Sequence, residues 1–276
     1  MLFLSSLMKQ QLSEDCRAPT TFRHSDRSRY RLGGPDSVDR QFFDGLGLVA
    51  GPVYGCVDSD SIDPPIRVTL RDTDLTVAGL APSGAGRVLL LACGALAHEI
   101  IALRRMNGWD HLDLQCLPAI WHNHPERIVP AVQDIVAARQ ADYDRIFVVY
   151  ADCGTGGQLQ AACDALGVRM IAGPHCYSFF EGNTRFAEHA DEITAFYLTD
   201  FLTRQFDAFV WKPLGLDRNP GLLDMYFGNY ETLVYLAQTD DTELTRRAEH
   251  IAARMGLMFE RRFTGYGDLA TALAQA

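Results

Sequence analysis

Short apolar runs alternate with helix-like segments from Arg87 onward, and this alternation is the strongest constraint on the fold. The apolar runs predict strands at 88–92, 112–117, 146–151, 168–172, 233–237 and 257–263. The amphipathic segments between them predict helices at 95–106, 126–139, 157–166, 243–255 and 268–274. Strands that alternate with helices of about a dozen residues are typical of parallel sheets with right-handed crossovers. We therefore predict an α/β fold: a doubly wound, mostly parallel sheet with helices on both faces.

Other segments carry weaker signals. Residues 191–209 have the spacing of a long amphipathic helix, and residues 66–78 alternate weakly, which predicts a hairpin around Asp72-Thr73-Asp74. The first 45 residues are polar and basic, so we expect an N-terminal arm at 1–45 that is either mobile or a clasp over a partner subunit or an anionic ligand. A loop-rich extension leads from this arm into a single α/β domain, predicted for residues 46–276.

Composition narrows the functional classes. The net charge is -10 and the pI is near 5.2, which disfavours nucleic-acid binding because that function usually needs a basic face. We find no run of about 18 apolar residues and no basic stretch before a long apolar core, so we expect neither a membrane span nor a signal peptide. Seven cysteines, an odd number, lie mostly in apolar or glycine-rich segments. This usage favours free or metal-bound thiols in a reducing cytoplasm.

Three cysteines follow candidate strands directly: Cys93, Cys153 and Cys176. Parallel strands deliver their following loops to one edge of the sheet, where ligands of open α/β folds bind. A soft metal needs several thiolates in one pocket, so we predict Cys93, Cys153 and Cys176 as metal ligands. The alternative is that these thiols are buried as small apolar side chains, which is the better explanation for Cys116 within a strand and Cys163 on a helix.

The identity of the metal stays open at this stage. Three cysteines with a free fourth position suit catalytic zinc, which binds water or substrate there. They also suit an iron–sulfur cluster, although such clusters more commonly have four cysteine ligands. Small residues beside the cysteines would let the backbone approach a cofactor closely or cradle an anion at a helix N-terminus; these predicted cofactor-binding residues are Gly94, Gly154, Thr155, Gly156 and Gly157.

Three further residues are candidates for catalysis: His122, His175 and Glu181. His122 follows the second predicted strand, and His175 precedes Cys176. Glu181 is a candidate general base or fourth metal ligand. A nucleophilic Cys153 with a histidine base is a further alternative, but one nucleophile leaves the other two strand-end thiols unexplained.

Several motifs together resemble a bacterial and archaeal family of unknown function over about residues 86–265. They are Ala-Cys-Gly at 92–94, Leu-Pro-Ala, His-Asn and Pro-Glu-Arg within 117–127, Tyr-x-Asp-Cys-Gly-Thr-Gly-Gly at 150–157, His-Cys-Tyr at 175–177 and Asp-Met-Tyr-Phe-Gly-Asn-Tyr at 224–230. Genes of that family often lie beside corrinoid-dependent methyltransferase systems. The resemblance implies methyl or one-carbon transfer, where a zinc–thiolate centre commonly activates a thiol acceptor. Its motifs include Cys93, His122, Cys153, His175 and Cys176. The resemblance also implies an acidic residue soon after His-Cys-Tyr; here Ser178 follows the motif and Glu181 comes later, so the fourth ligand stays open.

The leading hypothesis is a cytoplasmic metal-dependent enzyme, with zinc ahead of an iron–sulfur cluster, that transfers methyl or one-carbon groups to or from a small molecule. The rival class is a non-catalytic accessory protein that holds a metal, a corrinoid or a small acid for a partner methyltransferase. A thiol enzyme without metal is the third hypothesis. We also allow for a homo-oligomer and expect neither nucleic acid nor membrane as a partner.

Overall fold

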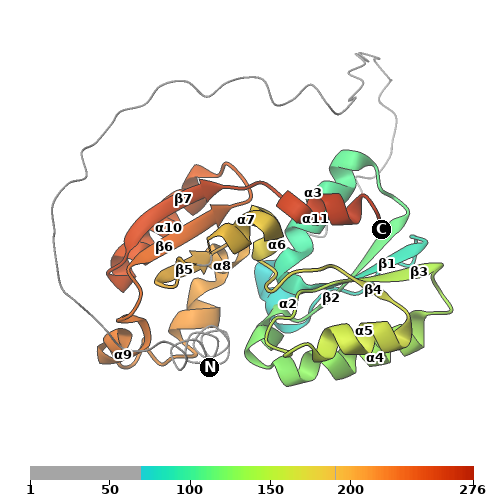
Figure 1. Cartoon of the computed structure of the whole chain (residues 1–276), viewed down its shortest axis with the longest axis horizontal. Helices are drawn as coiled ribbons and strands as arrows, with labels where there is room; N and C mark the ends of the chain where they lie inside the picture. Colours follow the sequence, from blue (N-terminus) through green and yellow to red (C-terminus); the bar gives the residue numbers. More distant parts are fainter. Residues whose placement is uncertain (1–69, 190) are drawn as a thin grey trace, which may run out of the picture. The chain divides into compact units, whose positions relative to one another are not determined.

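The structure, a computed structural model, describes residues 70–189 and 191–276 and has the predicted α/β architecture with parallel sheets (Figure 1). In the described ranges the strands form two sheets, where the sequence predicted one. The first sheet contains β1 (Val88–Cys93), β2 (Leu112–Leu117), β3 (Arg145–Val149) and β4 (Arg169–Met170). The second contains β5 (Ala195–Leu198), β6 (Thr232–Ala237) and β7 (Met258–Phe263). The predicted arm at 1–45 and the extension as far as residue 69 lie outside the described residues.

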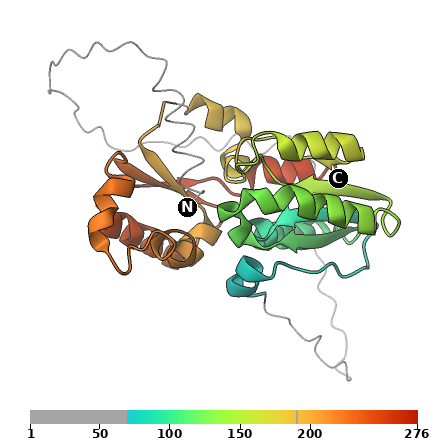
Figure 2. The same ribbon diagram turned by 90° about the horizontal axis from the view of Figure 1, so that it is seen from below.

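The first sheet has the order β2-β1-β3-β4, and every pairing in it is parallel. All six residues of β1 are buried, because this central strand is covered on both faces. Helix α3 (Ala97–Asn107) lies on one face, and α4 (Ile128–Arg139) and α5 (Gln158–Leu166) lie on the other (Figures 1 and 2). This distribution is what right-handed crossovers require when the chain moves from β1 to β2 on one side and then to β3 on the other.

The second sheet has the order β5-β6-β7 and is also parallel. Helices α8 (Asp200–Phe206) and α10 (Thr242–Met255) connect its strands. Asp241 caps α10, because its carboxylate accepts from the amides of Glu243 and Leu244. The remaining helices are short: α2 (Asp72–Val77), α6 (Ser178–Glu181), α7 (Asn183–Glu188), α9 (Leu223–Phe227) and α11 (Gly267–Leu273). Within the described ranges, no helix has both the length and the apolar character needed to cross a membrane.

Two sequence predictions of local structure were wrong. The long helix predicted for 191–209 is interrupted, because Ala195–Leu198 pair with β6 as strand β5 and Thr199 then caps a separate helix, α8. The run Ala-Phe-Tyr-Leu is compatible with either structure, and pairing with a neighbouring strand decided it. The predicted hairpin around Asp72 is the helix α2, whose Asp72 carboxylate accepts from His98 and Arg204.

Asp200 joins the carboxyl ends of β5 and β6. This buried carboxylate accepts hydrogen bonds from the Tyr235 hydroxyl (2.7 Å), the Gln238 amide (3.0 Å), and the amide and hydroxyl of Thr239 (3.1 and 2.6 Å). Four donors compensate the desolvation of the charge. Asp200 therefore has a structural explanation and no spare acceptor capacity for chemistry.

Glu99 on α3 is also a buried carboxyl group, but it lacks the hydrogen-bond donors that Asp200 has. It is 4% exposed, and its Oε2 has no hydrogen-bond partner among the described residues. Burial raises its pKa to about 7, although Arg204 and His98 oppose the shift. The folded state therefore binds this proton more tightly than the unfolded state does.

We predict that Glu99 makes the protein less stable as the pH rises. The contribution of Glu99 to stability is complete below its ordinary pKa of 4.5 and is lost as the pH rises through about 7. Replacing Glu99 by Gln removes the titration. Between pH 5 and 8 the free energy of unfolding of Glu99→Gln should therefore gain about 2 kcal/mol relative to wild type, as measured by urea denaturation. Glu249→Gln on the exposed face of α10 is the control; a constant difference between Glu99→Gln and wild type across this pH range would contradict the prediction.

Candidate metal centre

The side chains that could bind a metal or act in catalysis lie at the carboxyl edge of the first sheet. Cys93 ends β1, His122 lies in the short helix Ala119–Asn123 after β2, Cys153 follows β3 and Cys176 follows β4. The chain leaves β1 for β2 on one side and returns to β3 on the other, so β1 and β3 flank the topological switch point of the sheet. Loops diverge there and leave room for a ligand.

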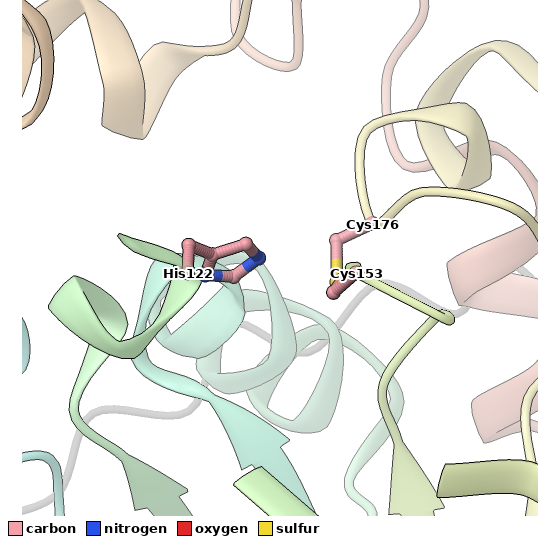
Figure 3. A group of neighbouring side chains, drawn as sticks. All are labelled: His122, Cys153 and Cys176. Carbon is pink, nitrogen blue, oxygen red and sulfur yellow. The ribbon is translucent and has the colours of Figure 1, made fainter. Parts of the chain in front are cut away.

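His122, Cys153 and Cys176 form a compact group of potential metal ligands. One ligand atom from each lies within 4.8 Å of the others. The sulfur atoms of Cys153 and Cys176 are 3.1 Å apart, and both residues are buried, with exposed fractions of 8% and 7%. Figure 3 shows a ring nitrogen of His122 directed towards the two cysteines. A group of one histidine and two cysteines at this spacing can hold a metal ion.

The imidazole of His122 is oriented by two contacts of its Nδ1 atom. Its Nδ1 lies 3.1 Å from the Ala119 carbonyl oxygen and 3.4 Å from Cys93 Sγ. A proton on Nδ1 can be donated to the carbonyl, which directs the lone pair of Nε2 towards a metal. Metal-binding histidines are commonly held in this way by a backbone carbonyl.

Cys93 lies beside this group. Its sulfur contacts His122 Nδ1 and accepts a hydrogen bond from the Ala95 amide (3.3 Å) at the start of the short helix Gly94–Leu96. The sequence predicted Cys93, Cys153 and Cys176 as the ligand set. The structure brings Cys153 and Cys176 together with His122 and places Cys93 against the far nitrogen of the imidazole.

Asp152 shapes the loop that presents Cys153. Its carboxylate accepts from the amides of Gly156 (3.1 Å) and Gly157 (2.6 Å) and from the Thr155 hydroxyl (2.9 Å). These amides were predicted to bind a cofactor or an anion; the carboxylate already serves as their anion. Among the described non-glycine residues, Cys153 alone has a positive φ (46°). The Asp152 hydrogen bonds help to hold that unfavourable backbone conformation.

The other predicted small residues have different surroundings. A Cβ on Gly94 would lie 2.5 Å from the Leu75 carbonyl oxygen, so close packing against α2 requires glycine there. Gly154 adopts a positive φ of 84° within the Asp152 loop. Cys116 and Cys163 are buried, in agreement with a packing role, and burial raises the pKa of Cys163 to about 11.

Electrostatic coupling shifts the pKa values of the two neighbouring thiols in opposite directions. The hydrogen bond from Cys176, together with the His122 charge, holds the pKa of Cys153 well below its usual value despite burial. The same hydrogen bond and burial raise the pKa of Cys176. Burial lowers the pKa of His122, but interactions with Cys93 and Cys153 outweigh burial and raise that pKa overall. Without a cation, one thiolate beside an imidazolium is therefore the favoured state.

His175 and Glu181, both predicted to be catalytic, lie in different surroundings. His175 stacks on Tyr177 (4.9 Å between ring centroids), and burial lowers its pKa, whereas the Cys153 charge opposes that shift. Its ring therefore lies near the cysteines without joining the ligand group. Glu181 is buried in an ion-pair network, with Oε1 2.9 Å from His189 Nδ1 and 3.1 Å from Arg262. The structure does not bring Glu181 into the group.

Sequence reasoning missed Tyr150. The residue follows β3 directly and is fully buried, and its hydroxyl has no oxygen or nitrogen partner among the described residues. Burial raises its pKa well above the usual value; the charges of Cys93, Cys176 and Cys153 and a hydrogen bond with the Cys93 thiol add to that effect. The available signal was its place in the motif Tyr-x-Asp-Cys-Gly-Thr-Gly-Gly, in which only the cysteine and the small residues after it were predicted to have a function.

The fold and the site define an α/β protein with a histidine–cysteine–cysteine group that can hold a metal at a sheet switch point. The family described as "Protein of unknown function (DUF1638)" matches residues 116–273, more than half of the chain, and this protein belongs to that family. No curated protein matches the chain. No solved structure matches it either.

We predict that Asp152→Ala weakens metal binding without removing a ligand. Loss of its hydrogen bonds should loosen the loop that fixes Cys153, and outer contacts of this kind typically change metal affinity roughly 10- to 100-fold. The measurement is competition for zinc with a chromophoric chelator. Asp164→Ala, which removes an exposed carboxylate on α5, is the matched control. Equal zinc affinities of the two variants would show that the Asp152 contacts do not support the site.

Proposed function

We propose that this protein is a metal-dependent enzyme whose metal is held by His122, Cys153 and Cys176. The observation that carries the proposal is the convergence of their ligand atoms to within 4.8 Å from three separate loops. Three protein ligands leave the fourth position of a tetrahedral metal free for water or substrate, as in catalytic zinc sites. Structural zinc sites usually close that position with a fourth protein ligand.

The donor set favours zinc. Two thiolates and one imidazole are a known catalytic zinc combination, whereas iron–sulfur clusters usually take four cysteines. Only two sulfur atoms belong to the compact group of the described residues, because Cys93 contacts the far side of the imidazole. The iron–sulfur alternative therefore needs cysteine ligands beyond the two in this group, such as Cys93.

The chain's own residues would prepare the site. The Ala119 carbonyl contacts Nδ1 of the imidazole, which would leave Nε2 for a metal, and Asp152 holds the loop that carries Cys153. Cys153 and Cys176 would hold the metal as thiolates. A bound divalent metal would supply a Lewis-acid centre and lower the pKa of a water or thiol at the open position.

We further propose methyl or one-carbon transfer to a small thiol as the reaction class. The support is the resemblance of the motifs to a family encoded beside corrinoid-dependent methyltransferases, together with the thiolate-rich ligand set. In the rival hypothesis the same site binds a metal, a corrinoid or a small acid for a partner methyltransferase without turnover. A methyl-donor assay separates the two, because an accessory protein forms no methylated product unless its partner is present.

We predict about one zinc per chain in protein purified without oxygen, as expected for a single three-ligand site. His122→Ala, Cys153→Ala and Cys176→Ala should each lose most of this metal, because each removes a ligand. Cys163→Ala should retain it, since Cys163 is buried on α5 and lies outside the ligand group. The measurement is metal content by mass spectrometry together with acid-labile sulfide.

Iron together with an equal amount of acid-labile sulfide would show that the site holds an iron–sulfur cluster and not zinc. The proposal of a metal-dependent enzyme would be wrong if the wild type held no stoichiometric metal, either as purified or after anaerobic reconstitution with zinc. Equal metal in the wild type and the Cys153→Ala variant would place the metal elsewhere in the chain.

A second candidate function is a redox dithiol, favoured by the 3.1 Å separation of the Cys153 and Cys176 sulfur atoms. Hydrogen peroxide could accept two electrons from the two thiols, forming one disulfide and two water molecules. Peptide mapping of metal-free protein treated with hydrogen peroxide tests this function. A Cys153–Cys176 disulfide that a dithiol reductant reverses would support it; alkylatable thiols at both positions after treatment would exclude it.

A further inference from the structure

We propose that Cys93 is a positioning residue of the metal centre, whose sulfur holds the Nδ1 side of His122 so that Nε2 faces the metal. Tyr150 holds the Cys93 thiol in turn. This inference rests on the proposed metal site, and it gives Cys93 a different role from the metal ligand that the sequence predicted.

The Cys93 sulfur is held by contacts with polar groups. The Ala95 amide donates to it over 3.3 Å, and Nδ1 of His122 lies 3.4 Å from it. The Tyr150 hydroxyl forms a hydrogen bond with the same thiol. Cys93 is fully buried, and hydrogen bonds in buried surroundings are stronger than those in water. The sulfur is therefore fixed on the Nδ1 side of the imidazole.

Strand register explains why Tyr150 and Cys93 meet. Ala92 of β1 pairs with Val149 of β3, and Cys93 and Tyr150 are the next residues along these two parallel segments. Side chains at matching positions of neighbouring strands lie side by side on one face of a sheet. The Tyr150 ring is also nearly parallel to the His122 ring, at 20° and with 6.3 Å between the ring centroids. The tyrosine therefore lies next to both the thiol and the imidazole.

The chemistry of a metal-bound imidazole explains the need for such a group. Figure 3 shows one ring nitrogen of His122 directed towards the two cysteines of the ligand group, whereas Nδ1 contacts Cys93. An imidazole that binds a metal through Nε2 carries its proton on Nδ1, and that proton needs an acceptor. The Ala119 carbonyl oxygen, 3.1 Å from Nδ1, is one acceptor, and the Cys93 sulfur is a second. Together they select the protonated nitrogen and orient the ring.

The same geometry separates Cys93 from the metal ligands. Among the described residues, the compact ligand group consists of His122, Cys153 and Cys176. The two nitrogens lie on different edges of the imidazole, so a metal at Nε2 and a sulfur at Nδ1 lie on different sides of the ring. Truncation of Cys93 should therefore weaken metal binding without changing the number of thiolates that bind the metal.

The test compares the wild type with Cys93→Ala, Cys93→Ser, Tyr150→Phe and the double variant Cys93→Ala/Tyr150→Phe. Cys163→Ala is the matched control, because it removes a thiol that is equally buried and lies outside the ligand group. Zinc affinity is measured by competition with a chromophoric chelator. Cobalt(II)-loaded samples report the number of thiolate ligands through their sulfur-to-cobalt charge-transfer absorption, and the thermal midpoint shows whether each variant is folded.

We predict that Cys93→Ala binds zinc roughly 10- to 100-fold more weakly than the wild type, with unchanged charge-transfer absorption per cobalt ion. Cys93→Ser should recover much of the affinity, because a hydroxyl oxygen also accepts a hydrogen bond. Tyr150→Phe should weaken zinc binding in the wild type but not in the Cys93→Ala background, since the tyrosine acts through the thiol.

Lower charge-transfer absorption per cobalt ion in Cys93→Ala would make Cys93 a metal ligand and overturn its positioning role. Equal zinc affinities of Cys93→Ala and Cys163→Ala would also overturn that role, as would a Cys93→Ser variant as weak as Cys93→Ala. A Tyr150→Phe effect that persists in the Cys93→Ala background overturns the role of Tyr150. If Cys93→Ala does not fold, weaker zinc binding by Tyr150→Phe supports the proposal and unchanged binding overturns it. A wild type that binds neither zinc nor cobalt overturns the metal site itself, a result that none of the other outcomes gives.

Discussion

The parallel pairing of β1 with β3 is the constraint on which the rest of the site depends. Residues Val88–Ala92 of β1 pair with Arg145–Val149 of β3, and both strands are buried almost throughout. Because the chain reaches β3 only after crossing to β2, the loops after β1 and β3 diverge at their carboxyl ends. The sheet therefore creates the space, and hydrophobic burial stabilises the strands that define it. Cys93 ends β1 on one side of this space, and Cys153 lies on the other in the loop after β3, which Asp152 holds by hydrogen bonds.

Charge within this space explains why the group suits a cation. Two thiols 3.1 Å apart in a buried site cannot both ionise easily, since the second charge is repelled by the first. The pKa of Cys153 is accordingly lowered and that of Cys176 raised, while His122 gains a proton beside the resulting thiolate. A divalent cation relieves this conflict because it compensates two thiolates and takes the place of the imidazole proton. Protons released from His122 and Cys176 would accompany such binding.

Much of the fold could be predicted from sequence because its signals are local. The strand at Leu112–Leu117 has the predicted bounds, and other strand and helix ends differ by only a few residues. The division into two sheets could not be predicted, since the pairing partner of each strand is a property of tertiary structure. The same limit applied to the site. Position after a strand indicated Cys153 and Cys176 as ligands. The group contains His122 where the sequence predicted Cys93, and this difference depends on how the loop after β2 folds. Apart from its place in the Tyr-x-Asp-Cys-Gly-Thr-Gly-Gly motif, nothing distinguished Tyr150 from a core residue, because an aromatic residue after an apolar strand is usually part of the core.

The separation of the ligands along the chain bears on the role of the site. His122, Cys153 and Cys176 come from loops that follow three different strands, so their ligand atoms converge only after the sheet has formed. The buried strands supply that assembly by their own packing. A small zinc-dependent domain, by contrast, folds around its metal because it lacks such a core. Here the core is already extensive and the fourth position has no ligand from the compact group. Three ligands on a preformed scaffold, with Cys93 and Ala119 contacting the imidazole from behind, are therefore better explained by chemistry at the metal than by a structural need for it.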